Sequence, residues 1–294
     1  MLAESTEAPL EQPLGTEHHI VTAQPLDEET RLGANRQPDW TTQHRFSEVE
    51  IYLLAPWEFS AEVGWDASVA EEGDVSHAVR QEFEIGLPWH TQIDYVIREA
   101  ASEDESFDIV GHSIEGSVAL AEWGVIPLNP TVLFEYTFGV GEPDEWEAKL
   151  LVGDELAPRW HWGANFAYEQ ETGGDRETEI AGSAAISYSV LDRKLGLGAE
   201  TKITAEEEEE EDADGEVEEE EEILASLGPS VQWRITDDIH LNLAALFGLT
   251  EASPTVDTFV ALAFTWGADD EGESGGAARP SEDDRLQPMS NQHR

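Results

Sequence analysis

Apolar and polar side chains alternate along most of the chain with a period of two residues. In residues 91–98, Ile93, Tyr95 and Ile97 lie on one face of an extended chain, and Asp94 and Arg98 lie on the other. A period of two, held over runs of about ten residues, is typical of β-strands with two different faces, whereas a helix repeats every 3.6 residues. The pattern therefore predicts an all-β protein.

Twelve such segments follow one another between Trp57 and Trp266. An even number of antiparallel strands brings both ends of a barrel to the same side. The stretch 47–54 also alternates, and this parity assigns it to a flanking or plug segment rather than to a thirteenth strand. Pro229 lies inside a predicted strand without an N–H for the ladder, and so predicts a bulge or a sheet edge. The predicted strands are 58–66, 78–87, 90–99, 107–121, 131–140, 146–153, 160–169, 178–190, 195–204, 222–234, 239–248 and 255–266.

The connections between these strands alternate in length. Tight turns are predicted at 88–89, 191–193 and 236–238, and longer acidic loops at 67–77, 100–106, 170–176 and 205–222. Short turns at one end and long loops at the other are typical of bacterial outer-membrane proteins. We therefore predict an up-and-down antiparallel transmembrane β-barrel of about 12 strands. A soluble sandwich or lipocalin-like barrel is the alternative.

Tryptophan positions favour the membrane barrel over the soluble one. Aromatic side chains gather where a membrane protein crosses the boundary between lipid and water. Six tryptophans fall beside the predicted short turns, and we expect them to form such a girdle. They are Trp57, Trp89, Trp123, Trp160, Trp233 and Trp266.

Composition divides the chain into three zones. Residues 1–56 form a polar N-terminal segment, predicted as a plug or a periplasmic flank, and 57–266 form the barrel with its acidic loop at 205–222. Residues 267–294 are rich in Gly, Asp, Glu and Ser and predict a disordered acidic tail. The start lacks the basic and apolar regions of a secretory signal, so an outer-membrane location requires that the signal has been removed.

Charge excludes several classes of function. The 294 residues include 65 acidic and 15 basic side chains, for a net charge of −50, so a nucleic-acid partner is not expected. The chain has no cysteine, which excludes disulfides, thiolate zinc sites and a cysteine nucleophile. No cofactor is predicted.

A run of acidic residues at 206–222 has 14 Asp or Glu among its 17 positions. Such a block repels itself, so an extended solvated loop is expected. Its carboxylates could also capture divalent cations weakly, although the spacing of an ordered calcium loop is absent.

The inward faces of the predicted strands carry the candidate functional residues. If the apolar faces contact lipid, acids outnumber bases inside the barrel, and buried charges there must be paired or hydrated. The predicted lumen-lining residues are Glu82, Glu84, Asp94, Arg98, Glu135, Glu147, Lys149, Asn165, Glu169, Glu200, Lys202 and Arg234.

One motif suggests enzyme chemistry. Residues 107–116, with Ser113 in the sequence Gly-His-Ser-Ile-Glu-Gly, resemble the nucleophile elbow of α/β-hydrolases. That elbow requires Gly two positions after the Ser, where this chain has Glu115. No helices alternate with the strands that follow, so we place Ser113 in a strand and predict no catalysis.

Several strand–turn–strand stretches resemble a known group of bacterial outer-membrane proteins. Residues 80–94, 123–130, 147–160 and 228–234 resemble barrels of the transporter and MetA-pathway-of-phenol-degradation type. The resemblance spans about residues 40–266 and implies an outer-membrane location and passage of small molecules. Barrels of this type often finish on a terminal aromatic residue, whereas Trp266 is followed by a tail.

Together these features predict passive passage of small solutes through an outer-membrane barrel that contacts lipid and prefers cations. A closed structural or cell-surface barrel, binding cations or partners through its acidic loops, is the alternative. A serine hydrolase using Ser113 is the third hypothesis.

Overall fold

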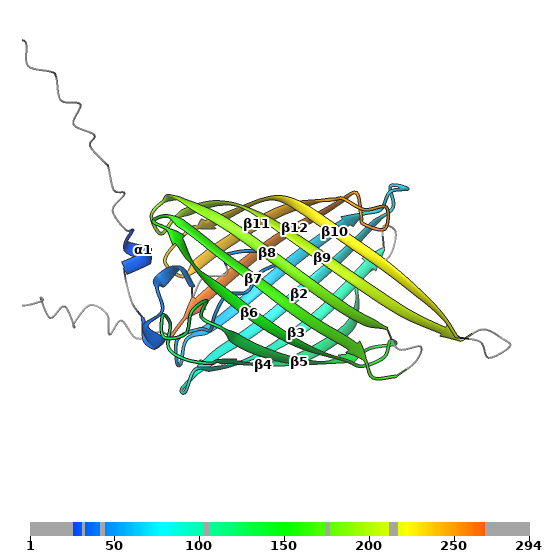
Figure 1. Cartoon of the computed structure of the whole chain (residues 1–294), viewed down its shortest axis with the longest axis horizontal. Helices are drawn as coiled ribbons and strands as arrows, with labels where there is room; N and C mark the ends of the chain where they lie inside the picture. The colour runs from blue at the N-terminus through cyan, green and yellow to red at the C-terminus, as the bar shows by residue number, and fades with distance from the viewer. Residues whose placement is uncertain are drawn as a thin grey trace, which may run out of the picture.

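The computed structural model describes residues 26–30, 33–41, 45–102, 106–173, 177–211 and 217–267. The described residues form a closed barrel of twelve antiparallel strands, in which each strand pairs with its neighbours in the chain and β12 pairs with β1 (Figure 1). The predicted fold class is confirmed. The strands are β1 (Phe59–Val69), β2 (Val75–Leu87), β3 (Thr91–Ser102), β4 (Asp108–Ala119), β5 (Thr131–Gly139), β6 (Glu145–Ala157), β7 (Trp160–Glu171), β8 (Thr178–Leu191), β9 (Leu195–Glu211), β10 (Val217–Arg234), β11 (Ile239–Gly248) and β12 (Val256–Trp266).

The two ends of the barrel differ. We call the end at which β1 begins and β12 finishes the termini end, and the opposite end the hairpin end. Three short helical segments lie before the barrel: α1 (Asp27–Thr30), η1 (Ala34–Arg36) and η2 (Asp39–Thr41). In Figure 1 α1 lies at the termini end, whereas β9 and β10 reach well beyond the other strands at the hairpin end. Among the described residues, no helix is long and apolar enough to cross a membrane.

The acidic stretch at 205–222 differs from the predicted loop. Its described parts continue β9 and β10 as a paired hairpin, with Glu206 opposite Glu222 and Glu207 opposite Glu221. Backbone hydrogen bonds hold this ladder, and the side chains of Glu207 and Glu221 are exposed to solvent. The loop prediction was therefore wrong for these residues. Repulsion between like charges opposes the packing of side chains, but two backbones can still pair when their acidic side chains point into solvent. Residues 212–216 lie outside the described residues.

The loop predicted at 67–77 is shorter in the structure, because the flanking strands extend into it. β1 continues to Val69 and β2 begins at Val75, so the strands extend past their apolar positions into polar sequence. β3 likewise continues to Ser102, inside the predicted loop at 100–106. The backbone ladder therefore continues beyond the run of outward apolar side chains.

Pro229 causes neither a bulge nor an edge. It pairs with Ala199 of β9 without a shift of register, and the ladder with β11 resumes in the same register at Ser230. The neighbouring Gly228 allows close approach, since a Cβ there would lie 1.7 Å from the carbonyl oxygen of Ala245. The prediction was wrong because the missing proline N–H interrupts only a short part of one ladder.

The outer face of the barrel is apolar. Val63, Phe134 and Phe166 are each more than half exposed, as expected for side chains that would contact lipid. Trp123 does not join the predicted girdle. It lies in the β4–β5 connection, where its ring packs edge-on against Trp40 at 5.6 Å. The other five tryptophans of the predicted girdle are exposed.

Candidate functional site: the barrel interior

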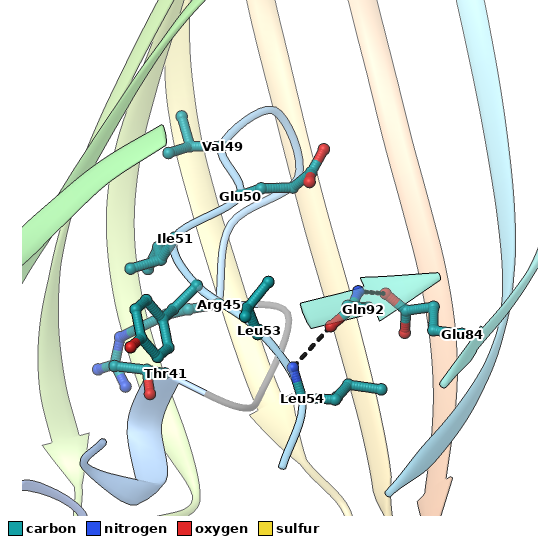
Figure 2. A pocket seen from close by; sticks show the side chains of 10 residues that line it. Thr41, Arg45, Val49, Glu50, Ile51, Leu53, Leu54, Glu84 and Gln92 are labelled. Atoms are coloured by element: carbon teal, nitrogen blue, oxygen red, sulfur yellow. Dashed lines mark hydrogen bonds between the residues drawn. The ribbon is translucent and has the colours of Figure 1, made fainter. Parts of the chain in front are cut away.

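Residues 45–55 run inside the barrel from the termini end, and we call them the inner segment (Figure 2). Val49, Ile51 and Leu53 are buried and belong to an apolar cluster with Trp40 of η2. The wall makes room for them with glycine: a Cβ on Gly163 would lie 2.8 Å from Val49 Cγ1. The inner segment therefore fits a groove shaped by the inward face of the wall.

Wall side chains satisfy the backbone of the inner segment, which forms no sheet of its own. The carboxylate of Glu200 in β9 accepts the N–H groups of Ser47, at 3.0 Å, and of Glu48, at 2.9 Å. At the other end, Gln92 Oε1 in β3 accepts the N–H of Leu54 at 2.6 Å (Figure 2). The two clamps lie on different strands and hold the segment across the lumen.

Residues 26–30 and 33–41 form a cap over the termini end. Asp39 Oδ2 accepts Arg193 Nε and Arg234 Nη1, both at 2.9 Å, and so joins the cap to the β8–β9 turn and to the end of β10. Glu28 of α1 is buried and lies 3.6 Å from the Arg45 guanidinium. The cap and the inner segment thus share one polar network.

None of the twelve residues predicted to line the lumen is exposed to solvent. Arg234 lies at the termini end, where its guanidinium binds Asp39 of the cap, and Glu200 holds the inner segment. Asn165, in the amide orientation that satisfies its partners, bonds the backbone of Glu50. Six of the twelve are buried: Glu82, Glu84, Asp94, Glu135, Asn165 and Glu200. The other six are half-buried: Arg98, Glu147, Lys149, Glu169, Lys202 and Arg234.

Ion pairs join some of these charges. Arg98 Nη2 lies 2.6 Å from Glu135 Oε1. Lys149 Nζ lies 3.0 Å from Glu147 in the wall and 3.4 Å from Glu50 in the inner segment. Bases in the middle of the barrel are therefore shared among carboxylates that outnumber them.

Strand register places many of the inward carboxylates side by side. Glu84 lies opposite Asp94, and Asp94 opposite Glu115, and the sequence of partners continues across the wall with one acid from each strand between β2 and β10. We call these nine residues the carboxylate row. They are Glu84, Asp94, Glu115, Glu135, Glu147, Glu169, Glu179, Glu206 and Glu222.

The carboxylate row climbs along the barrel. Glu84 lies near the termini end of β2, whereas Glu179 is the second residue of β8 at the hairpin end. Strands in a barrel tilt, so partners in register follow a helical path around the axis. Burial decreases along this path, from Asp94 at 2% exposed to the exposed Glu222 on the acidic hairpin.

A cavity of about 220 Å³ lies between the inner segment and the wall formed by β1, β2 and β12. Glu48 and Glu50 line it from the inner segment, with Glu62, Asp66 and Arg80 among the wall residues. Arg80 Nη2 lies 3.0 Å from Glu62. The cavity is polar and holds both signs of charge.

Burial perturbs acids at the termini end. It raises the pKa of Glu58, directly before β1, to about 6, and its carboxylate accepts the N–H of Ala55. Burial also raises the pKa of Tyr52 to about 12, while its hydroxyl donates to Ala121 at 2.7 Å. Tyr52 belongs to the inner segment and Glu58 follows it, so both groups lie close to where this segment meets β1.

Ser113 lies in β4, paired with Val96 and Thr137, and its side chain is fully buried. It therefore sits on a regular strand and not on a sharp turn before a helix. Another Ser–His–Glu arrangement is formed by Ser189, His161 and Glu29. Ser189 Oγ lies 3.5 Å from His161 Nδ1, and His161 Nε2 lies 3.4 Å from Glu29 Oε1. The Ser189 hydroxyl donates to Glu28 beneath the cap, so this group is part of the polar network and has no solvent-exposed nucleophile.

Among the residues that the structure describes, no three His, Asp or Glu side chains are arranged to hold a metal ion. The side chains of 208–220 lie outside that description, so weak cation capture at 206–222 stays a prediction.

Comparison with solved structures finds a similar fold in outer-membrane proteins. A crystal structure of an outer membrane channel from Pseudomonas putida F1 superposes with a TM-score of 0.57 at 9% identity, covering 73% of this chain and 97% of that one. The chain has the fold of an outer-membrane channel. The NanC porin matches with a TM-score of 0.50 at 8% identity, covering 70% of this chain and 98% of the porin.

Sequence comparison supports the resemblance given above. Residues 148–266 of the chain match the model of the family described as "Putative MetA-pathway of phenol degradation". The match covers β7 to β12 and most of β6. No curated protein sequence matches the chain.

Sequence reasoning missed the residues that attach the cap and the inner segment. Asp39, Arg45 and Gln92 make these contacts across more than thirty positions of the chain. The alternation at 47–54 was the one sequence signal for the inner segment, because its apolar positions Val49, Ile51 and Leu53 belong to the apolar cluster.

Proposed function

We propose that this protein is an outer-membrane channel for passive passage of small solutes, with a preference for cations and without catalysis or a cofactor. The carboxylate row is the observation that carries the proposal. It provides a continuous line of acids from the termini end to the hairpin end. A narrow tube with low-dielectric walls focuses such a field, which concentrates cations and excludes anions.

The outer surface supports a location in the outer membrane. Its exposed aromatic and aliphatic side chains would contact lipid over the middle of the barrel. We infer that the termini end faces the periplasm and that the acidic hairpin faces outward, since bacterial barrels keep their short turns on the periplasmic side.

Reversal potentials across planar bilayers in a KCl gradient test the proposal. The refolded protein should pass K⁺ in preference to Cl⁻. Neutralising Glu115 and Asp94 as Glu115→Gln and Asp94→Asn should reduce that preference at low and high salt, because buried charges are weakly screened. Preference for Cl⁻ in the unmodified protein would contradict the proposal.

A closed structural barrel is the second candidate, and the inner segment is the observation that favours it. The segment and the cap together cross the lumen at the termini end. In this role the acidic hairpin would bind cations or partners outside the cell. Absence of conductance, both in the unmodified protein and after the inner segment is deleted, would favour this candidate.

A further inference from the structure

We propose that the carboxylate row binds linear aliphatic polyamines, with successive ammonium groups held by successive carboxylates of the row. The proposal rests on the cation-preferring passage proposed above and names the class of cation that the interior fits. A group of acids alone would not define a polyamine site, but three further features of the carboxylate row support one.

The first feature is spacing. Neighbouring strands lie about 4.8 Å apart, so carboxylates in register repeat at about that interval. The ammonium groups of a linear polyamine are separated by three or four methylenes. An extended chain with bonds of about 1.5 Å therefore places these groups about 5 to 6 Å apart. Each strand from β2 to β10 thus offers one carboxylate for one ammonium group.

The second feature is a buried oxygen without a partner. Asp94 is 2% exposed and lies between Glu84 and Glu115 in the row, yet its Oδ1 atom has no hydrogen-bond partner among the described residues. A buried carboxylate oxygen in such a position is costly unless a donor reaches it. An ammonium group supplies three donors and a positive charge.

The third feature is the distribution of bases. Arg98 pairs with Glu135 and Lys149 with Glu147, in the middle of the row. Towards the hairpin end, Glu169 and Glu179 face each other across β7 and β8 without an ion pair to any described residue. These two acids are half-buried, and the row continues from them to the exposed Glu222. A flexible polycation could therefore enter from solvent along acids whose burial increases step by step.

Compact divalent ions fit the row less well. No three His, Asp or Glu side chains of the described residues converge on one point, so the row offers successive single contacts rather than a chelating cage. A ligand whose charge is spread along a chain gains several such contacts at once, as in other multivalent binding.

Calorimetric titration of spermine into the refolded protein in detergent at low salt tests the proposal, and it does not require an open pore. Spermine should bind at least about tenfold more tightly than Mg²⁺ to the unmodified protein. Replacing Glu169→Gln and Glu179→Gln together should weaken spermine binding by about tenfold. The matched control replaces Glu145→Gln and Glu171→Gln, a register pair outside the row, and should weaken binding by less than about threefold.

Three outcomes would overturn the row as a polyamine site: equal affinity for spermine and Mg²⁺, equal losses in the two double variants, or no binding of spermine. If a variant does not recover its β-sheet circular dichroism, the comparison of spermine with Mg²⁺ on the unmodified protein decides. K⁺ preference without tight spermine binding would remove this inference alone. Cl⁻ preference with tight spermine binding would remove the proposed function and keep the site.

Discussion

The carboxylate of Glu200 in the barrel wall accepts the backbone N–H of Glu48 in the inner segment at 2.9 Å, although the two residues are 152 positions apart in the chain. A charged side chain thus takes the place of a strand partner for backbone inside the lumen. The position of the inner segment therefore depends on the side chains of the wall around it.

Replacing Glu200→Ala should loosen the inner segment. The change leaves the half-buried N–H groups of Ser47 and Glu48 without their acceptor, at a cost of up to about 1–3 kcal/mol for each group. Because the chain has no cysteine, a single Ser47→Cys reports exposure by its labelling with a soluble maleimide. The labelling rate should rise by about tenfold or more. Glu179→Ala, which removes an inward acid outside this contact, should leave the rate unchanged; an equal rise in both would refute the clamp.

Replacing Gly163→Val should displace the inner segment by steric overlap. A Cβ at this position already lies 2.8 Å from Val49 and 3.2 Å from Ile51, and overpacking costs about 1–3 kcal/mol. We expect a larger single-channel conductance, since the segment moves and the barrel wall remains. Gly116→Val is the control, because no atom of the described residues lies within 4 Å of a Cβ there. An unchanged conductance for Gly163→Val would show that the inner segment does not limit the flow of ions.

Protonation of Glu58 should stabilise the folded barrel near its termini end. Burial raises its pKa from 4.5 to about 6, so the folded protein binds more protons than the unfolded chain between these values. The contribution of Glu58 to stability is therefore fully present below pH 4.5 and is lost as the pH rises to about 6. Urea unfolding across this range should show a smaller fall in stability for Glu58→Gln than for the unmodified protein. If the free energy of unfolding fell equally with pH in both proteins, Glu58 would not be the source of the pH dependence.

Shortening the acidic hairpin by deleting residues 207–221 should reduce cation preference at low salt only. The exposed acids of the hairpin act on ions from solvent, and the Debye length falls to about 3 Å near 1 M salt. Reversal potentials measured at both ionic strengths check this. A loss of preference of the same size at 1 M would show that the hairpin acts inside the lumen.

Replacing Ser113→Ala should leave conductance and any other activity intact, because its hydroxyl is buried in β4. A fluorophosphonate probe should not label the unmodified protein. Labelling that disappears in Ser113→Ala would revive the hydrolase hypothesis.

The amino-acid pattern by itself determined the strands and the side of the wall that each residue faces. An alternation such as Ile93, Asp94, Tyr95 needs no distant contact to specify a strand with one apolar face, because successive side chains point to opposite sides. The even number of strands follows from counting these segments. Their lengths were less predictable, since the paired backbone of β9 and β10 continues through residues that carry no apolar signal.

Tertiary structure alone decided which inward residues become neighbours. Alternation places Asp94 and Glu115 inside the barrel, but only the register of β3 with β4 sets them side by side. Register depends on how the whole sheet tilts and closes, which no local stretch encodes. The inner segment was decided in the same way. Its backbone is held by Gln92 and Glu200, which come together only when the barrel has closed around it.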